Sequence, residues 1–494
     1  MNRTGILGIE ENQVRKILKR YLPRCRWFRD KAEVIGDIEV RDFFPLGGKE
    51  EFFVLVIETV FSSGRRSIYS LPLFFPSRLP RGFFKSAAAG RMRAGRRTGY
   101  LCDAFYSKEF HGLVWKLFSK KRTVAGEKGG LLFSRKYSRA AGLPKAFEID
   151  ILKKEQSNSS AVYGGRYFIK WYRGLEEINP EAEMLRYLSV AGFKNSPVLR
   201  GEIVLAVKNR SIVQGIFQEF IPAEQNAWEY FLNGIGKLSV KKPAEKGGAA
   251  YKGLLRNISL IGQRTAALHA VFARRSADVR FSPSRMDPGY RRQLYLSIKE
   301  KTERVRAMLK KFKKPEVFEG DFDKLASAAL EETEKILGKN PGGMRIRVHG
   351  DYHLGQLLFT GRDFFIIDFE GEPARSGEER GVKHSPLRDV AGMLRSFHYA
   401  AHAAHFKQRK GRSASVEEQE SVDALYRSMA ERFLYAYGQE MKLSESLPDT
   451  EIKTAELLRI YMIEKALYEI EYELNSRPSW VFIPILGLKS ILRK

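Results

Sequence analysis

The sequence changes its hydrophobic pattern close to Pro222, and this change constrains the fold more than any other feature. Before this point, short apolar runs are separated by Gly and Pro, which predicts β-strands. After it, apolar residues recur at helical spacing through most of the chain. The stretch 347–373 interrupts the helices with two strand-like runs and many acidic residues. We therefore expect an α+β protein, with a strand-rich lobe followed by a mainly helical lobe.

The chain has 494 residues, which is too long for one simple core, so we expect several subdomains. A helix-like opening is followed by strand-like runs, and then by a Gly-, Lys- and Arg-rich segment with mixed signals. After this segment come the strands and single helix of the first lobe, and then the helical lobe. The predicted boundaries are an N-terminal subdomain at 1–85, an intermediate subdomain at 86–145, the first lobe at 146–222 and the helical lobe at 223–494.

The net charge of +28 is unusually basic for a globular protein. Such a balance favours anionic partners such as nucleic acid, phosphorylated ligands or acidic membrane faces. The basic residues are spread along the chain, however, and the densest run at 81–97 matches no zinc-finger or RNP-type pattern. We expect most of them on a solvated surface, and we do not expect nucleic acid as a partner.

The sequence contains no apolar run that approaches the roughly 18 residues needed to span a bilayer. Its N-terminus lacks the basic and then apolar pattern of a signal peptide. Cys25 and Cys102 are the only cysteines, which is too few for a disulfide scaffold. We therefore expect a cytoplasmic protein without a membrane partner.

The acidic stretch is organised as a predicted β-hairpin, with strands at 357–359 and 363–367. Asp351 lies in the loop before the hairpin, Gln356 lies at the entry to its first strand, and Asp368 follows its second strand. The hairpin therefore brings three oxygen donors to one edge. Such a donor set suits a hard cation such as Mg²⁺.

A zinc site is a weaker interpretation of this stretch. His349 and His353 have the spacing of half a zinc-binding helix, but the neighbouring glycines oppose a helix and the Glu of the H-E-x-x-H motif is missing. A zinc hydrolase is therefore disfavoured, and we expect His349 to fix the loop through hydrogen bonds. Asp351 could instead cap its loop, and Asp368 could be an ordinary turn residue.

The order His-Gly-Asp-x-x-x-x-Gln followed by Asp-Phe-Glu parallels the catalytic loop and metal-binding motif of protein kinases. In phosphoryl transfer one Asp accepts the proton of the attacking hydroxyl, while a second acid and an amide hold the metal that bridges the phosphates. ATP and Mg²⁺ are therefore the expected cofactors.

The first lobe supplies a candidate lysine for the phosphates. Gly164 and Gly165 predict a tight two-residue turn, and Lys170 ends the strand after it. The next helix begins near Pro180 and carries Glu183, the expected partner of Lys170. A lysine on a strand is otherwise a common surface residue.

The turn before this hairpin lies where a phosphate-covering loop belongs, but it has hydroxyl and amide side chains in place of a Gly-rich motif. A P-loop is not found. The strand end before Pro222 is a candidate connector to adenine, or simply a strand end. The residues expected to bind nucleotide are thus Gln156, Ser157, Asn158, Ser159, Ser160, Lys170, Glu183, Gln218, Glu219, Phe220 and Ile221.

Taken together, these motifs resemble the bacterial maltokinases, both the stand-alone enzymes and the kinase parts fused to trehalose synthase. The resemblance is carried by 349–356, 367–375, 385–397 and 464–480, with further matches near 22–28. It implies a bilobal protein-kinase-like fold related to aminoglycoside phosphotransferases, with an N-terminal cap and a mainly helical C-lobe. The implied reaction converts ATP and maltose to maltose 1-phosphate and ADP, feeding α-glucan synthesis from trehalose.

The resemblance also implies roles for individual residues. Asp351 would be the base for the anomeric hydroxyl, Gln356 and Asp368 would bind Mg²⁺, and Asp389 would anchor the catalytic-loop backbone. The implied acceptor site consists of His353, Glu370, Glu372, Arg375, Lys465, Tyr468, Glu469, Arg477 and Trp480.

The aromatic residues Tyr468, Tyr472 and Trp480 could equally be helix-packing core. Two positions depart from the family pattern, because Tyr352 replaces the usual Leu and His398 stands where members often have Asp. Neither change removes a catalytic role.

Two other functions stay open. One is a kinase of the same fold that acts on an aminoglycoside, choline or another sugar. The other is a non-catalytic or nucleic-acid-binding protein that uses the basic surface. The expected partner is maltose as a small-molecule substrate, and association with a trehalose synthase is left open.

Overall fold

The computed structural model divides the chain into two compact units, Met1–Val190 with Pro197–Pro222 and Ala191–Ser196 with Ala223–Lys494. The main division thus follows Pro222, where the hydrophobic pattern of the sequence changes. The structure describes residues 3–4, 9–49, 51–137, 147–152, 157–207, 210–238, 248–312, 319–338, 342–372, 375–409, 415–441 and 451–493.

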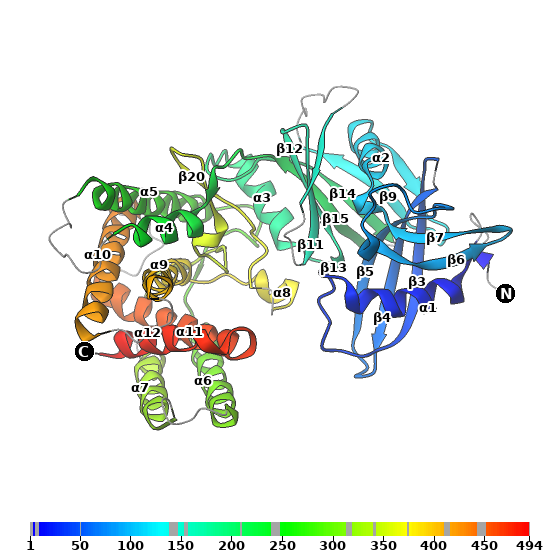
Figure 1. The fold of residues 1–494 in the computed structure, drawn as a ribbon. Helices are drawn as coiled ribbons and strands as arrows, with labels where there is room; N and C mark the ends of the chain where they lie inside the picture. The colour runs from blue at the N-terminus through cyan, green and yellow to red at the C-terminus, as the bar shows by residue number, and fades with distance from the viewer. Residues whose placement is uncertain are drawn as a thin grey trace. The chain divides into compact units, whose positions relative to one another are not determined.

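The first unit contains an antiparallel sheet with the strand order β1-β2-β6-β7-β5-β4-β3, and β13 pairs with β5 at its side. The helix α1 (Glu11–Tyr21) packs on this sheet against β3 and β6 (Figure 1). Apolar side chains alternate along the central strands and form the core beneath the helix. The strands are β1 (Arg3–Thr4), β2 (Ile9–Glu10), β3 (Ile35–Gly47), β4 (Phe52–Phe61), β5 (Arg66–Phe74), β6 (Ala88–Ala94), β7 (Arg97–Asp103) and β13 (Gly174–Leu175).

A second antiparallel sheet in the same unit has the order β10-β11-β12-β15-β14-β9-β8. The helix α2 (Lys108–Ser119) packs against β9 and β14, and α3 (Pro180–Val190) packs against β14. The strands are β8 (Thr123–Ala125), β9 (Leu131–Lys136), β10 (Ile149–Ile151), β11 (Asn158–Tyr163), β12 (Tyr167–Tyr172), β14 (Leu199–Val207) and β15 (Arg210–Glu219).

The segment 86–145 does not form the intermediate subdomain that we expected. Its first two strands, β6 and β7, belong to the first sheet, whereas β8 and β9 belong to the second sheet. Strand β7 pairs with β5, and β9 pairs with β14, so each half completes a sheet with strands from distant parts of the sequence. Residues 138–146, which include the end of this segment, lie outside the described residues.

The predicted hairpin around Gly164 and Gly165 is present as β11 and β12. Both glycines have positive φ angles, +56° and +63°, which glycine adopts without steric cost. Tyr163 pairs with Tyr167, so the loop has three residues rather than the two we expected. The third loop residue, Arg166, donates its backbone N–H to the carbonyl of Tyr163 at 3.1 Å and so closes the turn.

Helices begin at residues that satisfy their free backbone N–H groups. The side chain of Asn179 accepts from the N–H of Ala182 at 2.9 Å, and Pro180 occupies the first turn of α3. In the second unit, Asp287 accepts from the N–H of Tyr290 at 2.9 Å at the start of α6. These caps fix where each helix begins.

A buried arginine joins the two sheets of the first unit. The Nη2 atom of Arg173 lies 3.0 and 2.9 Å from the two carboxylate oxygens of Asp103, at the end of β7. Its Nε donates to the hydroxyl of Ser159 on β11 at 2.8 Å, and its guanidinium lies 4.7 Å from the ring centroid of Trp27. Because the Arg173 side chain is fully buried, its charge depends on these contacts for compensation.

The second unit is mainly helical, as expected, and carries the predicted hairpin of β19 and β20. The helices α6 and α7 run side by side, and α11 packs against α6, α7, α9 and α12 (Figure 1). The strands are β16 (Gln225–Asn226), β17 (Ser284–Arg285), β18 (Met344–Arg345), β19 (Leu357–Phe359) and β20 (Phe364–Ile366). The helices are α4 (Ala227–Gly236), α5 (Ala249–Phe272), α6 (Pro288–Lys311), α7 (Glu319–Gly338), α8 (Gly377–Arg380), α9 (Leu387–Gln408), α10 (Val416–Met441), α11 (Glu451–Ser476) and α12 (Phe482–Leu492).

Within the described part of the chain, every helix is too short or too polar to cross a membrane.

The buried pair of Arg173 and Asp103 gives a stability prediction. Asp103→Asn should lower the free energy of unfolding by about 3–5 kcal/mol, because it leaves a buried guanidinium without its counter-charge. A urea titration followed by tryptophan fluorescence measures this loss, since Trp27 contacts the guanidinium.

Glu176→Gln is the matched control, because Glu176 pairs with Arg29 at 2.9 Å with both side chains about one-third exposed. We expect this change to cost only about 0–1 kcal/mol. Equal losses in the two variants would show that Arg173 does not depend on Asp103.

Candidate active site

The loop 349–356 is held by the first turns of α9. The buried carboxylate of Asp389 accepts the backbone N–H of His349 at 2.7 Å and that of Gly350 at 3.0 Å. A third contact, at 3.1 Å, comes from Nε2 of His269 on α5. The expected anchoring role of Asp389 is therefore confirmed.

Two further residues of α9 contact the same loop. Ser396 accepts the backbone N–H of Leu354 at 3.1 Å. A Cβ atom on Gly392 would lie 2.5 Å from the carbonyl oxygen of Tyr352, so only glycine permits this approach. Asp389, Gly392 and Ser396 follow helical spacing, so one face of α9 positions the whole loop.

The loop is fixed from its other sides by buried polar contacts. His349 donates from Nε2 to the carbonyl of Ile367 at 2.9 Å, which confirms its predicted role as a core histidine. The hydroxyl of Tyr352 lies 2.8 Å from that of Thr265, which itself donates to the carbonyl of Ile261 at 2.7 Å. Tyr352 stands where members of the resembled family usually have Leu, and its buried hydroxyl has a hydrogen-bond partner in Thr265.

Asp351 projects from this loop beside a lysine. Its Oδ1 lies 3.1 Å from Nζ of Lys465 on α11, and its Oδ2 lies 3.8 Å from Nε2 of His353. Burial raises the pKa of Asp351, but Lys465 and then His353 outweigh this effect and hold the pKa well below the usual range of Asp. The carboxylate is therefore ionised at neutral pH.

His353 has a defined tautomer. Its Nδ1 accepts the backbone N–H of Gly355 at 3.0 Å, so the ring proton of the neutral form lies on Nε2, which faces Asp351. The predicted acceptor residue His353 thus lies next to the predicted base.

The hairpin brings two of the predicted metal ligands together. Gln356 donates from Nε2 to Oδ2 of Asp368 at 3.0 Å. Asp368 has a φ of +64°, a left-handed conformation that is strained for a residue with a side chain and is common at ligand sites. A carboxylate and an amide oxygen suit Mg²⁺, which usually keeps several water ligands and takes others from phosphates. The residues present therefore fit this ion.

A pocket opens beside the loop and between helices of the second unit. Its empty space is about 290 Å³, a volume that includes open solvent at the mouth. It is lined by Lys301, Gly350, Tyr352, Glu372, Arg388, Gly392, Tyr461, Glu464, Lys465 and Tyr468.

Glu464 is the central carboxylate of the pocket wall. It lies 3.4 Å from each of three cations, which are Lys301, Arg375 and Arg388. Burial raises the pKa of Glu464, but Arg388 and then Lys301 outweigh burial and lower this pKa well below its usual range. Glu464 is thus a buried, fully compensated charge.

Glu372 is compensated in the same way. It accepts from Arg375 at 2.7 Å and from Arg388 at 3.3 Å, and it lies 3.9 Å from Lys465. Burial raises the pKa of Glu372, whereas Arg388 and Lys465 lower it, and the net shift is downward. The predicted acceptor residues Glu372, Arg375 and Lys465 are therefore parts of one ion network.

Tyr468 completes this group. The Nζ atoms of Lys465 and Lys301 lie 4.6 and 5.6 Å from its ring centroid. Burial raises the pKa of Tyr468 to about 12, so its hydroxyl stays protonated and can donate a hydrogen bond into the pocket.

The other predicted acceptor residues on this helix and beyond it form a separate group. Glu469 accepts from Arg395 at 3.0 and 2.6 Å. The ring of Trp480 is parallel to that of Tyr399 with centroids 6.2 Å apart, and the guanidinium of Arg477 lies 5.0 Å from the Trp480 centroid. Their side chains thus already engage neighbours in the protein, and they do not line the pocket.

Glu370 lies in the turn that follows β20. Its backbone carbonyl accepts from Arg380 at 3.0 Å, which fixes the turn, and its side chain is half-buried. It does not line the pocket either.

In the first unit, Lys170 forms an ion pair with Glu181 at 2.9 Å, whereas the partner expected from the sequence was Glu183. Glu181 also accepts from the hydroxyl of Tyr172 at 2.8 Å and is buried, whereas Glu183 is half-buried. Both acids lie in the first turn of α3. Glu181 lies on the side of that turn that faces the sheet.

The predicted phosphate-covering residues are split by the alternation of β11. Ser160 pairs with Lys170 and Asn158 pairs with Tyr172, so their side chains lie on the Lys170 face. The Ser159 side chain lies on the opposite face, where it accepts from Arg173, so its hydroxyl has a structural role. Ser157 precedes the strand, and Gln156 lies outside the described residues.

The predicted adenine connector has part of its backbone already engaged. The N–H of Glu219 donates to the carbonyl of Val198 at 3.0 Å, and the N–H of Phe220 donates to that of Arg166 at 2.8 Å. The Glu219 side chain pairs with Arg200. Gln218 lies on the Lys170 face of β15, since it is opposite Phe168, and Ile221 follows the strand.

Sequence reasoning missed several residues of these sites, among them Glu181, Lys301, Arg388, Glu464 and Ser396. Ser396 follows Asp389 by seven residues, so helical spacing alone could have indicated it. Lys301 comes from a helix more than 150 residues before Glu464 in the sequence, and no local signal marks it.

Comparisons with known proteins agree with this architecture. Residues 21–106 match the maltokinase N-terminal cap domain family. A curated glucosamine kinase of Streptacidiphilus jiangxiensis is 24% identical over 348 residues, which cover 68% of this chain and 72% of that protein. A glucosamine kinase of Mycolicibacterium smegmatis (strain ATCC 700084 / mc(2)155) is 25% identical over 345 residues, covering 68% and 78%.

Solved structures show the same fold. Glucosamine kinase in complex with glucosamine, ADP and inorganic phosphate has a TM-score of 0.67 at 18% identity, covering 96% of this chain and 99% of that chain. Another structure of glucosamine kinase, crystal form B, has a TM-score of 0.68 at 16% identity and covers 100% of both chains.

The expected bilobal kinase fold with an N-terminal cap is thereby confirmed. The resemblance to the maltokinases is confirmed by the match of the cap region. The chain therefore carries a maltokinase N-terminal cap domain and is a kinase of the capped, protein-kinase-like fold that glucosamine kinase shares.

Proposed function

We propose that the protein transfers the γ-phosphoryl group of ATP to the anomeric hydroxyl of maltose, giving maltose 1-phosphate and ADP. The observation that carries this proposal is the ionised carboxylate of Asp351, which lies on a loop fixed by α9 next to a small polar pocket. A kinase needs a carboxylate placed in this way to orient the attacking hydroxyl.

Asp351 acts mainly by position in this mechanism. Because Lys465 holds its pKa low, it is a weak base at neutral pH. Phosphoryl transfer through a loose transition state needs little deprotonation before the phosphorus–oxygen bond to the leaving group stretches. Asp351 therefore accepts a hydrogen bond from the sugar hydroxyl and receives its proton late, as the new bond to phosphorus forms.

Other residues hold the nucleotide in the proposed reaction. Gln356 and Asp368 hold Mg²⁺, which supplies charge neutralisation at the phosphates when it is bound. Lys170, oriented by Glu181, donates to phosphate oxygens. Further residues that would contact the nucleotide lie on the Lys170 face and near the strand ends. They are Ser157, Asn158, Ser160, Gln218, Glu219, Phe220 and Ile221.

The charge of the pocket supports a neutral acceptor. Lys301, Arg388 and Lys465 balance Asp351, Glu372 and Glu464, and each of these acids contacts at least one of the cations. No excess of negative charge therefore remains among these residues to attract an ammonium group. A neutral sugar instead finds hydrogen-bond donors and the ring of Tyr468.

Glucosamine is the second candidate acceptor, and one observation favours it. The two curated relatives described above are both glucosamine kinases.

If the acceptor is maltose, the product is an activated disaccharide that serves α-glucan synthesis from trehalose. Association with a trehalose synthase and a cytoplasmic location belong to the same proposal.

Replacement of the proposed base gives the first test. Asp351→Asn should lower kcat by about 10²–10⁴-fold, because the amide cannot receive the proton. Phosphorus NMR of a reaction with ATP, Mg²⁺ and maltose shows both the product and the position phosphorylated.

Asp363→Asn is the matched control, since Asp363 lies in the hairpin turn and pairs with Arg264 at 2.8 Å. Its activity should stay close to that of the wild type. Unchanged turnover in Asp351→Asn would refute the assignment of the base.

The acceptor is tested by comparing kcat/KM for maltose, glucosamine and glucose at neutral pH. We expect maltose to exceed glucosamine by at least about tenfold, which corresponds to about 1.4 kcal/mol of transition-state binding. A preference for glucosamine would show that the acceptor is an amino sugar and not maltose. The assignment of the protein as a kinase would be unaffected.

The pH dependence tests the pairing of Asp351 with Lys465. In the wild type the carboxylate stays ionised as the pH falls through the usual range of Asp, so activity there does not depend on its protonation. Lys465→Met removes the larger of the two lowering effects and leaves that of His353, so the pKa of Asp351 rises relative to the wild type. The acid limb of kcat/KM should therefore move to higher pH.

Lys301→Met serves as the control, because it removes the same charge from the same pocket without removing the contact to Asp351. Its acid limb should not move. An unshifted limb in Lys465→Met would contradict the proposed electrostatics.

A further inference from the structure

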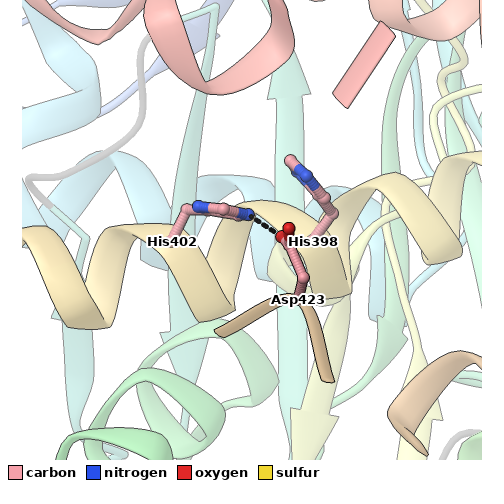
Figure 2. Close-up of side chains that lie close together, drawn as sticks. All are labelled: His398, His402 and Asp423. Carbon is pink, nitrogen blue, oxygen red and sulfur yellow. Dashed lines mark ion pairs between the residues drawn. The ribbon is translucent and has the colours of Figure 1, made fainter. Parts of the chain in front are cut away.

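The helix α9 carries a second group of polar side chains beyond the turns that hold the loop. Three of the chain's eight histidines, His398, His402 and His405, lie on this helix within eight residues. Figure 2 shows His398 and His402 projecting from α9, with Asp423 of α10 beside them. This group lies outside the pocket and the catalytic loop described above.

The three side chains in Figure 2 lie close together. One ring nitrogen from each of His398 and His402 and one carboxylate oxygen of Asp423 all lie within 4.8 Å of one another. Nε2 of His402 lies 3.4 Å from Oδ1 of Asp423, and the dashed line in Figure 2 marks this ion pair. His398 and His402 are one helical turn apart, which places both rings on one side of α9.

These histidines lack the hydrogen bonds that buried imidazoles normally make. His398 and His402 are 1% and 4% exposed, yet Nδ1 of His398 and Nε2 of His402 have no hydrogen-bond partner among the described residues. The 3.4 Å contact between His402 and Asp423 does not have hydrogen-bond geometry. A buried polar atom without a partner needs an explanation, and a bound ion is one.

His111 shows what a satisfied core histidine looks like in the same chain. It is fully buried, and its two ring nitrogens lie 2.8 Å from the hydroxyl of Tyr163 and 2.7 Å from the carbonyl of Phe105. The contrast separates His398 and His402 from His111.

The charged and polar neighbours of this group have partners of their own. The charge of Arg395 itself is taken up by Glu469. The Asp423 carboxylate is oriented by Gln419, which donates to Oδ1 at 3.3 Å, as outer contacts commonly orient metal ligands.

We propose that His398, His402 and Asp423 bind a divalent transition-metal ion of the zinc class. Two imidazole nitrogens and one carboxylate oxygen are ligands that Zn²⁺ accepts, with water in the fourth position. Mg²⁺ prefers oxygen ligands, so this site does not take the ion that serves the phosphates.

The geometry needs only a small adjustment. With metal–ligand distances of about 2.0–2.1 Å, the ligand atoms of a tetrahedral ion lie about 3.4 Å apart. His402 and Asp423 already have this separation, at 3.4 Å, and the ring nitrogen of His398 lies within 4.8 Å of both ligand atoms. The ion would cross-link α9 to α10 and so stiffen the helix whose first turns position the catalytic loop.

The experiment uses the full chain without a histidine tag, stripped of metal with a chelator and returned to metal-free buffer. Co²⁺ is titrated and followed by its visible ligand-field absorption, and Zn²⁺ is then added as a competitor. We expect one equivalent of Co²⁺ to bind, Zn²⁺ to displace it, and the thermal midpoint to rise with either ion. Excess Mg²⁺ should not compete.

Four variants locate the ion. His402→Gln and Asp423→Asn should each weaken Co²⁺ binding by at least about tenfold, as loss of a direct or supporting contact does at known sites. His405→Gln and Glu420→Gln are the matched controls on the same two helices and should bind as the wild type does. Circular dichroism without metal shows that each variant is folded, and the half-buried Asp423 keeps the test valid if a histidine variant does not fold.

Three outcomes would overturn the proposal. The first is a wild-type chain that binds neither ion, and the second is equal binding by the wild type and Asp423→Asn. The third is a loss in His405→Gln as large as that in His402→Gln, which would refute the ligand assignment.

Discussion

The buried carboxylate of Asp389 is the interaction on which the candidate active site depends. It accepts the backbone N–H groups of His349 and Gly350 and contacts His269, so three donors compensate one buried charge. A carboxylate in such a place is stable only while its donors stay in position, because an unpaired buried charge is very costly. The loop that carries Asp351 is thereby tied to the start of α9.

The pocket wall follows the same principle on a larger scale. Glu464 and Glu372 are each surrounded by cations, and their ionised forms persist because these cations outweigh the effect of burial. Such a network holds its side chains in a fixed geometry and leaves little net charge for an acceptor to neutralise. The site therefore combines a rigid carboxylate at Asp351 with a polar and nearly neutral wall, which suits a sugar hydroxyl as the nucleophile. The proposed metal site extends this positioning role to the second half of α9.

Much of this architecture could be predicted from local sequence, whereas the pairing of side chains could not. The two short apolar runs at 357–359 and 363–367, separated by a turn, predicted the hairpin that brings Gln356 to Asp368. The ion pair of Glu181 with Lys170 depends on how α3 docks on its sheet, and helical periodicity within one turn does not predict it. The three-residue loop after β11 likewise depends on strand register, which Gly-Gly alone does not fix.

Amide hydrogen exchange at residues 349–350 tests the central claim most directly. In Asp389→Asn one of the two oxygen acceptors becomes an NH₂ group, and the charge is lost. We expect these two amides to exchange about ten- to a hundredfold faster, as the loss of a charged hydrogen bond implies. The amides of β19 and β20 should keep their protection. Unchanged protection at 349–350 would contradict the account, because the loop would then be held by something other than Asp389.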